Sequence, residues 1–318
     1  MLSKTLLAGG LGGIVLACPL PTSAWALGGD HRGETTVACG QVITRSIKLA
    51  NDLHNCPGNG LEVGAPNITI DLNGHTIDGS GEALPFSGID NTPEGLSRTG
   101  HYGVTIKNGT VTNFGGGVTL AAGADRNVVQ RILAIANGGA GISARDVDRP
   151  YVSDSAATDS FVGIRLDFVT NARVERSAAT DNSVGFRLDS VTNARVERSA
   201  ALGNTLNGIL LTGTSRGTVL YRNSAVNNDL DGIFVSSSVT GTRIYNNDAN
   251  GNGTATGAPP QDGIDVDATD AATVIRDNRA RNNGDLGIEA TPGVTDGGGN
   301  HASGNGNPAQ CLNIACTP

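Results

Sequence analysis

The stretch VGIRLDFVTNARVERSAA, at residues 162–179, returns 22 residues later as VGFRLDSVTNARVERSAA, at residues 184–201. The two copies are identical at 16 of 18 positions and differ only where Ile164 and Phe168 are replaced by Phe186 and Ser190. Self-similarity at a fixed short period is typical of repeat proteins, in which each repeat is one structural unit that packs on its neighbours. The fold is therefore expected to be built from stacked coils of about this length.

The same period continues on both sides of the duplicated stretch. A glycine that opens an alternation of apolar and polar residues recurs at Gly60, Gly88, Gly117, Gly141, Gly163, Gly185, Gly208, Gly232, Gly263 and Gly287. An alanine column keeps the same period at Ala134, Ala157, Ala179, Ala201, Ala225, Ala249 and Ala280. The residue three positions after each of these alanines is Asn in six of the seven repeats, and Ser160 is the exception. The asparagines are Asn137, Asn182, Asn204, Asn228, Asn252 and Asn283.

Each repeat is predicted to contain short strands joined by turns. In Gly163-Ile164-Arg165-Leu166 the alternation places Ile164 and Leu166 on one face and Arg165 on the other. Asn, Asp, Gly and Ser interrupt these runs, which indicates turns, and the chain after the N-terminal segment shows no sustained helical period. We therefore predict an all-β parallel β-helix (a solenoid) with coils of about 22–24 residues, in which the alanine and asparagine columns stack in vertical rows. A leucine-rich repeat would need a Leu-x-x-Leu-x-Leu pattern, and a β-propeller a period near 40 residues.

Composition fits this fold and narrows the possible partners. The chain has 318 residues, 46 of them glycine, with 38% apolar but only 3% aromatic residues. Small aliphatic side chains suit a narrow interior, and the apolar fraction is too high for a disordered chain. The formal net charge of -8 argues against a nucleic-acid partner, because that function requires a basic surface.

The N-terminus has the features of an export signal. Lys4 precedes an apolar stretch at residues 5–17, and Ala24-Trp25-Ala26 forms an A-x-A cleavage site. We predict a signal peptide at residues 1–26, a short linker at residues 27–36 and a single β-helix domain at residues 37–318, hence a secreted or extracellular protein with no membrane span. Lipid attachment at Cys18 is the alternative.

Four cysteines remain after that segment, and they are Cys39, Cys56, Cys311 and Cys316. In an exported chain they imply two disulfides, for which three connectivities are possible. Pairing of the cysteines that are close in sequence would brace the two ends of the domain. A metal site is the alternative, although the C-x-x-C spacing typical of zinc sites is missing.

The chain resembles the right-handed parallel β-helix proteins of the pectate-lyase-like superfamily, including the NosD-like group with carbohydrate-binding and sugar-hydrolase-like repeats. The resemblance lies in NITIDLNGHTIDG at residues 67–79, in GNGNPAQC at residues 304–311 and in the repeats between them. It implies a right-handed β-helix and an extracellular polysaccharide or cell-envelope glycan as partner. The fold hosts lyases, hydrolases, epimerases, adhesins and binding proteins, so it does not decide between them. The N-T-D, D-D and G-H-G motifs of polygalacturonases and the D-P-H-D motif of alginate epimerases are absent.

Candidate site residues lie on the outward positions of the glycine-led strands. Arg165 and Arg187 are expected to be neighbours on successive coils, beside Asp167 and Asp189. The arginine pair could bind the carboxylates of an acidic polysaccharide, because the guanidinium fork matches a carboxylate. Alternatively, the four residues form a surface charge lattice that was copied by the duplication, in which each pair contributes little.

Farther along, Asp262, Asp265, Asp267 and Asp270 form the densest acidic cluster of the sequence, and the first three are the candidate metal ligands. Such an oxygen-rich set suits Ca²⁺, and a pair of carboxyl groups could also act as general acid and base. A solvated acidic edge is the alternative. Phe234 and Leu210, on the two preceding coils, are candidates for stacking against a sugar or are ordinary surface apolar residues.

Two interruptions of the period, at residues 78–102 and 251–261, border these strands and are expected to flank a groove. His101 and Tyr102 lie in the first one and are candidates for the base of a lyase or epimerase. The sequence thus leaves three functions open: a secreted protein that binds or scaffolds polysaccharide, an enzyme acting on uronate-containing polymers, or a surface adhesin. It does not determine the oligomeric state or the substrate.

Overall fold

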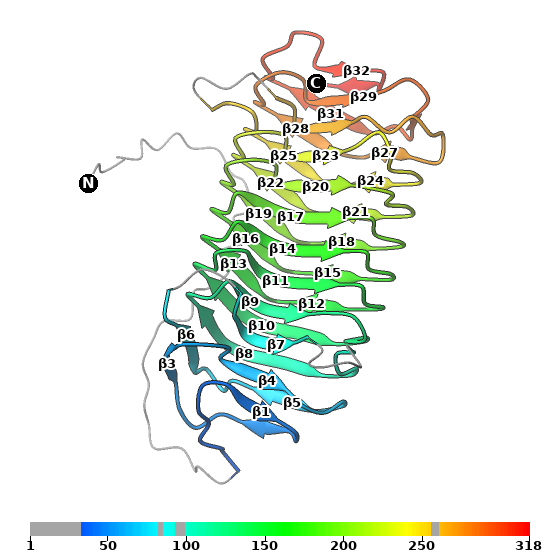
Figure 1. Cartoon of the computed structure of the whole chain (residues 1–318). Helices are drawn as coiled ribbons and strands as arrows, with labels where there is room; N and C mark the ends of the chain where they lie inside the picture. Colours follow the sequence, from blue (N-terminus) through cyan, green and yellow to red (C-terminus); the bar gives the residue numbers. More distant parts are fainter. Residues whose placement is uncertain (1–32, 82–84, 93–98, 256–260) are drawn as a thin grey trace, which may run out of the picture. The chain divides into compact units, whose positions relative to one another are not determined.

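The computed structural model describes residues 33–81, 85–92, 99–255 and 261–318 (Figure 1). Over these residues the chain consists of short strands and turns, and none of them is helical. Over the described residues the strand pairs are parallel, and they connect each coil to the next one along the chain. The predicted all-β parallel solenoid is confirmed.

Three columns of strands run along the solenoid. The glycine-led column forms a 12-stranded sheet: β1 (Gln41–Ile43), β4 (Leu61–Val63), β7 (Ser87–Asn91), β9 (Gly116–Leu120), β11 (Ala140–Arg145), β14 (Val162–Asp167), β17 (Val184–Asp189), β20 (Ile209–Thr212), β23 (Ile233–Val235), β26 (Ile264–Val266), β29 (Ile288–Ala290) and β32 (Cys311–Leu312). We call its solvent side the glycine-column face.

The second column follows on each coil, and we call its solvent side the second face. Its strands are β2 (Ile47–Lys48), β5 (Thr69–Asp71), the first parts of β8 (Thr105–Thr112) and β10 (Val128–Ile135), β12 (Tyr151–Ser153), β15 (Arg173–Glu175), β18 (Arg195–Glu197), β21 (Val219–Tyr221), β24 (Arg243–Tyr245), β27 (Val274–Arg276) and β30 (Thr295–Asp296).

The third column carries the alanines. Its strands are β3 (Leu53–Cys56), β6 (Thr76–Gly79), the second parts of β8 and β10, β13 (Ala156–Thr158), β16 (Ala178–Thr180), β19 (Ala200–Leu202), β22 (Ser224–Val226), β25 (Asp248–Asn250), β28 (Arg279–Arg281), β31 (Asn300–Ser303) and β33 (Cys316–Thr317).

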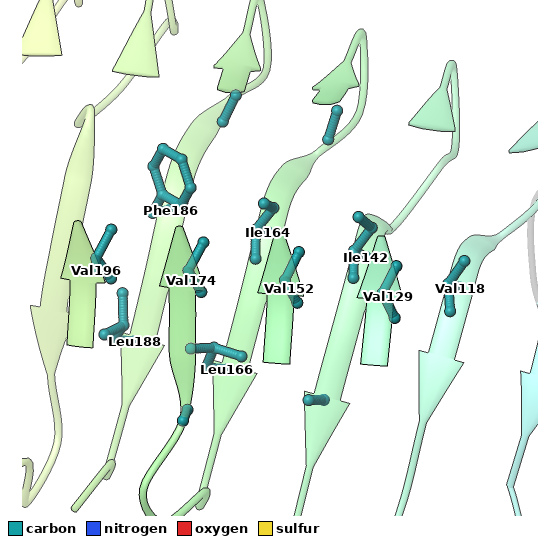
Figure 2. Close-up of a cluster of buried hydrophobic side chains, with 14 of the residues drawn as sticks. Val118, Val129, Ile142, Val152, Ile164, Leu166, Val174, Phe186, Leu188 and Val196 are labelled. Carbon is teal, nitrogen blue, oxygen red and sulfur yellow. The ribbon is translucent and has the colours of Figure 1, made fainter. Parts of the chain in front are cut away.

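The predicted alanine column is a continuous buried row. Ala157, Ala179, Ala201 and Ala225 are paired in register on successive strands, and each is at most 1% exposed. Small side chains at this row leave room for larger aliphatic residues on the other two columns. Figure 2 shows these larger residues stacked in rows that meet in the interior: Val118, Ile142, Ile164 and Phe186 from the glycine column, and Val129, Val152, Val174 and Val196 from the second column.

The predicted asparagine column forms a hydrogen-bonded ladder. The Nδ2 of Asn204 donates to Oδ1 of Asn228 at 2.8 Å, and the Nδ2 of Asn228 donates to Oδ1 of Asn252 at 2.9 Å. Each amide also reaches a backbone carbonyl, as Asn204 does at the oxygen of Ala179. An amide side chain carries both donors and an acceptor, so a buried column of asparagines satisfies itself from coil to coil.

A second ladder was not predicted. It joins Asn223, Asn247, Asn278 and Asn300 at the corner between the second and third columns, with side-chain bonds of 3.0–3.2 Å. Serines hold the equivalent positions on the preceding coils. The sequence contained a signal for this ladder, because each of these asparagines stands two residues before an alanine and therefore keeps the period of the repeat.

Two disulfides lie near the ends of the described solenoid. Cys39 is bonded to Cys56 with a Cα–Cα distance of 5.4 Å, and Cys311 is bonded to Cys316 with a Cα–Cα distance of 6.2 Å. The connectivity between cysteines that are close in sequence, one of the three left open, is therefore the one that forms. Within the described residues, the first residue paired with another coil is Thr35, which forms a parallel bridge with Leu49. The expected signal peptide and the alternative lipid site at Cys18 lie outside the described residues.

Candidate functional site

The glycine-column face changes character along the solenoid. Strand register places the outward residues of successive coils in one row: Ser143, Arg165, Arg187, Leu210, Phe234, Asp265 and Glu289. The row is thus basic, then apolar, then acidic, in the order expected from the sequence. Parallel pairing brings the side chains of adjacent coils within roughly 5 Å of one another.

Arg165 and Arg187 are each held by an aspartate of their own strand. The guanidinium of Arg165 contacts Oδ2 of Asp167 at 2.5 and 2.6 Å, and the guanidinium of Arg187 contacts Oδ2 of Asp189 at 2.8 Å. Each arginine therefore already has a carboxylate partner, which offsets the repulsion between the two guanidinium groups. This geometry fits the charge-lattice alternative better than a pair of arginines free to bind substrate.

Next to the arginines lies a small apolar cluster that is separate from the interior core. Ala140, Val162 and Val184 occupy the positions immediately before the repeat glycines, and Leu210 packs against them. Phe234 follows Leu210 on the next coil and is half-buried. Phe234 in turn pairs in register with Asp265, so an aromatic side chain directly borders the acidic end of the row.

Three carboxyl groups converge at that acidic end. Asp231, Asp262 and Asp265 each place a carboxylate oxygen within 4.8 Å of the other two. We call these three residues the aspartate cluster. Asp231 and Asp262 are only 4% and 6% exposed, whereas Asp265 is half-buried and is the member most open to solvent. The cluster is therefore a partly desolvated concentration of negative charge, which is costly unless protons or a cation offset it.

Local hydrogen bonds hold two of the three carboxyl groups in place. Asp231 accepts from the backbone N–H of Asp262 at 2.9 Å and from Nδ2 of Asn207 at 3.1 Å. Asp262 accepts from the backbone N–H of Leu286 at 2.7 Å. Among the described residues, Asp265 has no hydrogen-bond donor or ion-pair partner. Its carboxyl group is thus the one whose oxygens are available to a ligand.

The environment raises the pKa of all three carboxyl groups. Burial raises the pKa of Asp231 to about 6. Burial, followed by the charges of Asp231, Asp267 and Glu289, raises the pKa of Asp265 to about 7. Burial and the charges of Asp231 and Asp265 also hold the pKa of Asp262 well above the ordinary range of an aspartate. Because the groups interact, they titrate as a set near neutral pH, and protonated and ionised carboxyl groups coexist there.

This arrangement supports two kinds of chemistry. A protonated carboxyl group beside an ionised one is the pair that general acid and base catalysis of glycoside cleavage uses. With all groups ionised, the three carboxylates supply an all-oxygen donor set that suits Ca²⁺. In that case Asp231, Asp262 and Asp265 would hold the ion, and its charge would lower all three pKa values.

The predicted acidic residues come together only in part. Asp262 and Asp265 belong to the cluster, whereas Asp267 is not among the three converging carboxyl groups, although its charge raises the pKa of Asp231 and Asp265. Asp231 was missed. A signal existed, because Asp231 and Asp262 both stand directly before the repeat glycine, as Asn207 does one coil earlier.

His101 and Tyr102 lie far from this cluster. Asn91, at the end of β7, binds the backbone N–H and carbonyl of His101 at 2.8 Å each. Strand β7 precedes β26 by seven steps in the 12-stranded sheet, which corresponds to roughly 34 Å at about 4.8 Å per coil. Tyr102 is exposed at a corner, beneath the guanidinium of Arg126. Parts of both expected groove borders, at residues 82–84, 93–98 and 256–260, lie outside the described residues.

Comparisons with known proteins agree with the fold. Residues 94–249 match the model of a family described as the right handed beta helix region. The chain is a right-handed parallel β-helix protein, and the resemblance to this class is confirmed. No curated protein matches the sequence. The described part of the chain contains no helical segment of the length and hydrophobicity that a bilayer crossing requires.

Several solved structures are similar. The A-module of the mannuronan C-5 epimerase AlgE6 from Azotobacter vinelandii has a TM-score of 0.67 at 17% identity, covering 89% of this chain and 85% of the module. The Dettilon tailspike protein has a TM-score of 0.63 at 14% identity, covering 87% of this chain, which spans only 60% of the tailspike chain. A mutant of the periplasmic alginate epimerase AlgG has a TM-score of 0.53 at 12% identity, covering 87% of this chain and 76% of the other. Such low identities establish the fold alone.

Proposed function

We propose that this chain is an exported protein that binds an extracellular polysaccharide along the glycine-column face and cleaves its glycosidic bonds at the aspartate cluster. The observation that carries the proposal is the convergence of Asp231, Asp262 and Asp265 within 4.8 Å, at pKa values raised toward neutrality. Two disulfides and the export signal expected at residues 1–26 support a location outside the cytoplasm.

The roles within the cluster follow from burial. Asp262 is buried, and its raised pKa keeps it protonated at neutral pH, so it is suited to donate a proton to the leaving oxygen. Asp265 is more open to solvent and has no donor of its own, so its ionised form can activate a water molecule or stabilise positive charge on the sugar ring. Phe234, in register with Asp265, offers an apolar surface on which a sugar ring can rest.

Hydrolysis is favoured over elimination or epimerisation. Those two reactions need a base near the uronate C5 proton and a cation at the uronate carboxylate. Arg165 and Arg187 are paired with aspartates, and Arg165 lies four coils away from Asp265, roughly 19 Å at about 4.8 Å per coil. His101 lies farther still. Binding of Ca²⁺ at the cluster, with the chain serving as a glycan-binding scaffold or adhesin, is the competing outcome.

The test is a polysaccharide panel with matched variants. The wild type is incubated with neutral polymers, alginate, pectin and glycosaminoglycans, and new reducing ends and unsaturated products are measured. We expect new reducing ends without unsaturated products on at least one polymer. Asp265→Asn and Asp262→Asn should lower the rate by roughly 10²-fold or more. Asp229→Asn, which changes an exposed aspartate on the coil of Asp231, should not.

The outcomes separate the alternatives. Unsaturated products would indicate a lyase. Binding of a polymer without any new chain ends, with and without Ca²⁺, would contradict hydrolysis and leave a binding or scaffolding role. Full activity in both Asp265→Asn and Asp262→Asn would show that the aspartate cluster is not where cleavage occurs.

A further inference from the structure

The second face of the solenoid carries a charge pattern that the proposed function does not use. On β15 and β18 the outward residues form a neutralised lattice. The guanidinium of Arg173 contacts the carboxylates of Glu175 and Glu197 at 2.9 and 2.5 Å, and that of Arg195 contacts Glu197 at 2.8 Å. Glu175 and Glu197 are almost fully buried by these arginines. Arg176 and Arg198, which directly follow these strands, also contact Glu175, and Arg176 contacts Asp154 as well. Every guanidinium group of the lattice therefore already has a carboxylate partner.

On the next coils the carboxylates disappear and the arginines remain. Strand register places Tyr221 above Glu197, Tyr245 above Tyr221, and Arg276 above Tyr245. Arg222 directly follows Tyr221, and Arg243 is the first residue of β24. Arg222, Arg243 and Arg276 are exposed, and within the described ranges none of them has a carboxylate within 4.0 Å. We call these three arginines together with Tyr221 and Tyr245 the arginine–tyrosine patch.

The two tyrosines hold the patch in shape. Their rings stack with centroids 4.5 Å apart. The guanidinium of Arg222 lies 4.9 Å from the centre of the Tyr221 ring, and that of Arg276 lies 5.0 Å from the centre of the Tyr245 ring. Cation–π contact of this kind orients an arginine without neutralising its charge. The guanidinium forks are therefore positioned but still free to bind an anion.

The surface is also hollowed here. Arg243, Tyr245, Val274 and Arg276 line a depression of about 300 Å³ between β24 and β27. Its walls thus come from two arginines, one tyrosine and one valine. A sugar ring that carries a carboxylate would offer both a charged group for the arginine forks and an apolar face for the ring.

We infer that the arginine–tyrosine patch is a second glycan-binding site, which takes an acidic, uronate-bearing polysaccharide. The inference goes beyond the proposed cleavage site, because it uses another face of the same coils and none of its residues. Three clustered arginines without a carboxylate partner are notable on a chain whose net charge is -8, since the chain as a whole carries an excess of negative charge. A nucleic acid is a poorer fit, because non-specific binding of a duplex usually involves about 6–10 neutralised phosphates.

The patch is tested by direct binding, using polygalacturonate as the acidic polymer and dextran as the neutral one. The wild type should retain polygalacturonate and not dextran, with an affinity that falls as salt is raised. The double variant Arg243→Ala/Arg276→Ala should bind polygalacturonate at least roughly tenfold more weakly, as expected for the loss of charge-assisted hydrogen bonds. Both arginines are exposed and unpaired, so thermal unfolding should show an intact fold.

Two controls keep this site separate from the cleavage site. Arg281→Ala removes an exposed arginine from β28 on the third column and should leave binding within twofold of the wild type. Asp265→Asn should lower the cleavage rate by roughly 10²-fold or more but leave polygalacturonate binding at the arginine–tyrosine patch unchanged, so failure of one proposal is distinguishable from failure of the other. Equal binding by the Arg243→Ala/Arg276→Ala variant, equal retention of dextran, or tighter binding of single-stranded DNA or phosphatidylserine vesicles would overturn the inference.

Discussion

Replacing Asp265 by asparagine removes one negative charge from the aspartate cluster while keeping the shape of the side chain. We expect the variant to be more stable than the wild type at pH 8 and no more stable at pH 4. The reason is that burial and three neighbouring carboxylates raise the pKa of Asp265 to about 7 in the folded protein, against 3.8 for an unperturbed aspartate. Ionising this residue in the folded state therefore costs free energy that the unfolded chain does not pay.

The size and sign of the effect follow from this difference. A gap of about 3 pH units at about 1.36 kcal/mol each gives an upper bound of about 4 kcal/mol, and solvent access to the half-buried carboxyl reduces the expected value to about 1–2 kcal/mol. Because the pKa of this carboxyl group is raised in the folded state, the free-energy cost of ionising it is complete above pH 7. It declines as the pH falls toward 3.8 and is absent below that value. The variant therefore gains only on the alkaline side.

Thermal unfolding followed by circular dichroism measures the effect. A gain of 1–2 kcal/mol corresponds to roughly 2–6 °C in Tm for a chain of this size. Asp229→Asn is the matched control, since it removes the same charge from an exposed position on the coil of Asp231, and its Tm should follow the wild type at both pH values. Equal Tm values for Asp265→Asn and the wild type at pH 8, or the same gain at pH 4, would refute the claim that these carboxyl groups share a desolvated site.

Three further perturbations test the cluster and the solenoid. Calcium at roughly 100 times its Kd should raise the free energy of unfolding of the wild type by roughly 2.7 kcal/mol at pH 8, and Asp265→Asn should lose most of that gain. An equal response in both proteins would exclude the cluster as the calcium site. Asn204→Ala should lower the free energy of unfolding by about 3–5 kcal/mol in denaturant titrations, because the ladder loses hydrogen bonds on both sides and leaves buried polar groups unpaired. A loss below about 1 kcal/mol would show that the ladder is not needed for stability. Gly185→Ala should also destabilise the fold, because the added Cβ would meet the carbonyl oxygen of Gly208 well inside contact distance; an unchanged Tm would contradict that packing.

The repeat period by itself determined most of the architecture. A 22-residue duplication with apolar alternation can bury its small side chains only by winding into stacked coils, so the rows of Ala157, Ala179 and Ala201 and the asparagine ladder followed from spacing alone. The disulfide connectivity was narrowed to three possibilities but not chosen, because pairing depends on Cα separation, which sequence spacing does not give.

The composition of the candidate site was decided only in three dimensions. Strict alternation would turn Asp231 inward, on the same side as Ile233. Instead the intervening Gly232 faces the interior, where a Cβ would meet the amide of Asn252, and Asp231 joins the outward-facing Asp265. The break in alternation depends on how closely the glycine backbone approaches the asparagine ladder of the next coil. Convergence of residues 31 positions apart in the sequence, such as Asp231 and Asp262, is likewise a property of the stacked coils and not of either coil alone.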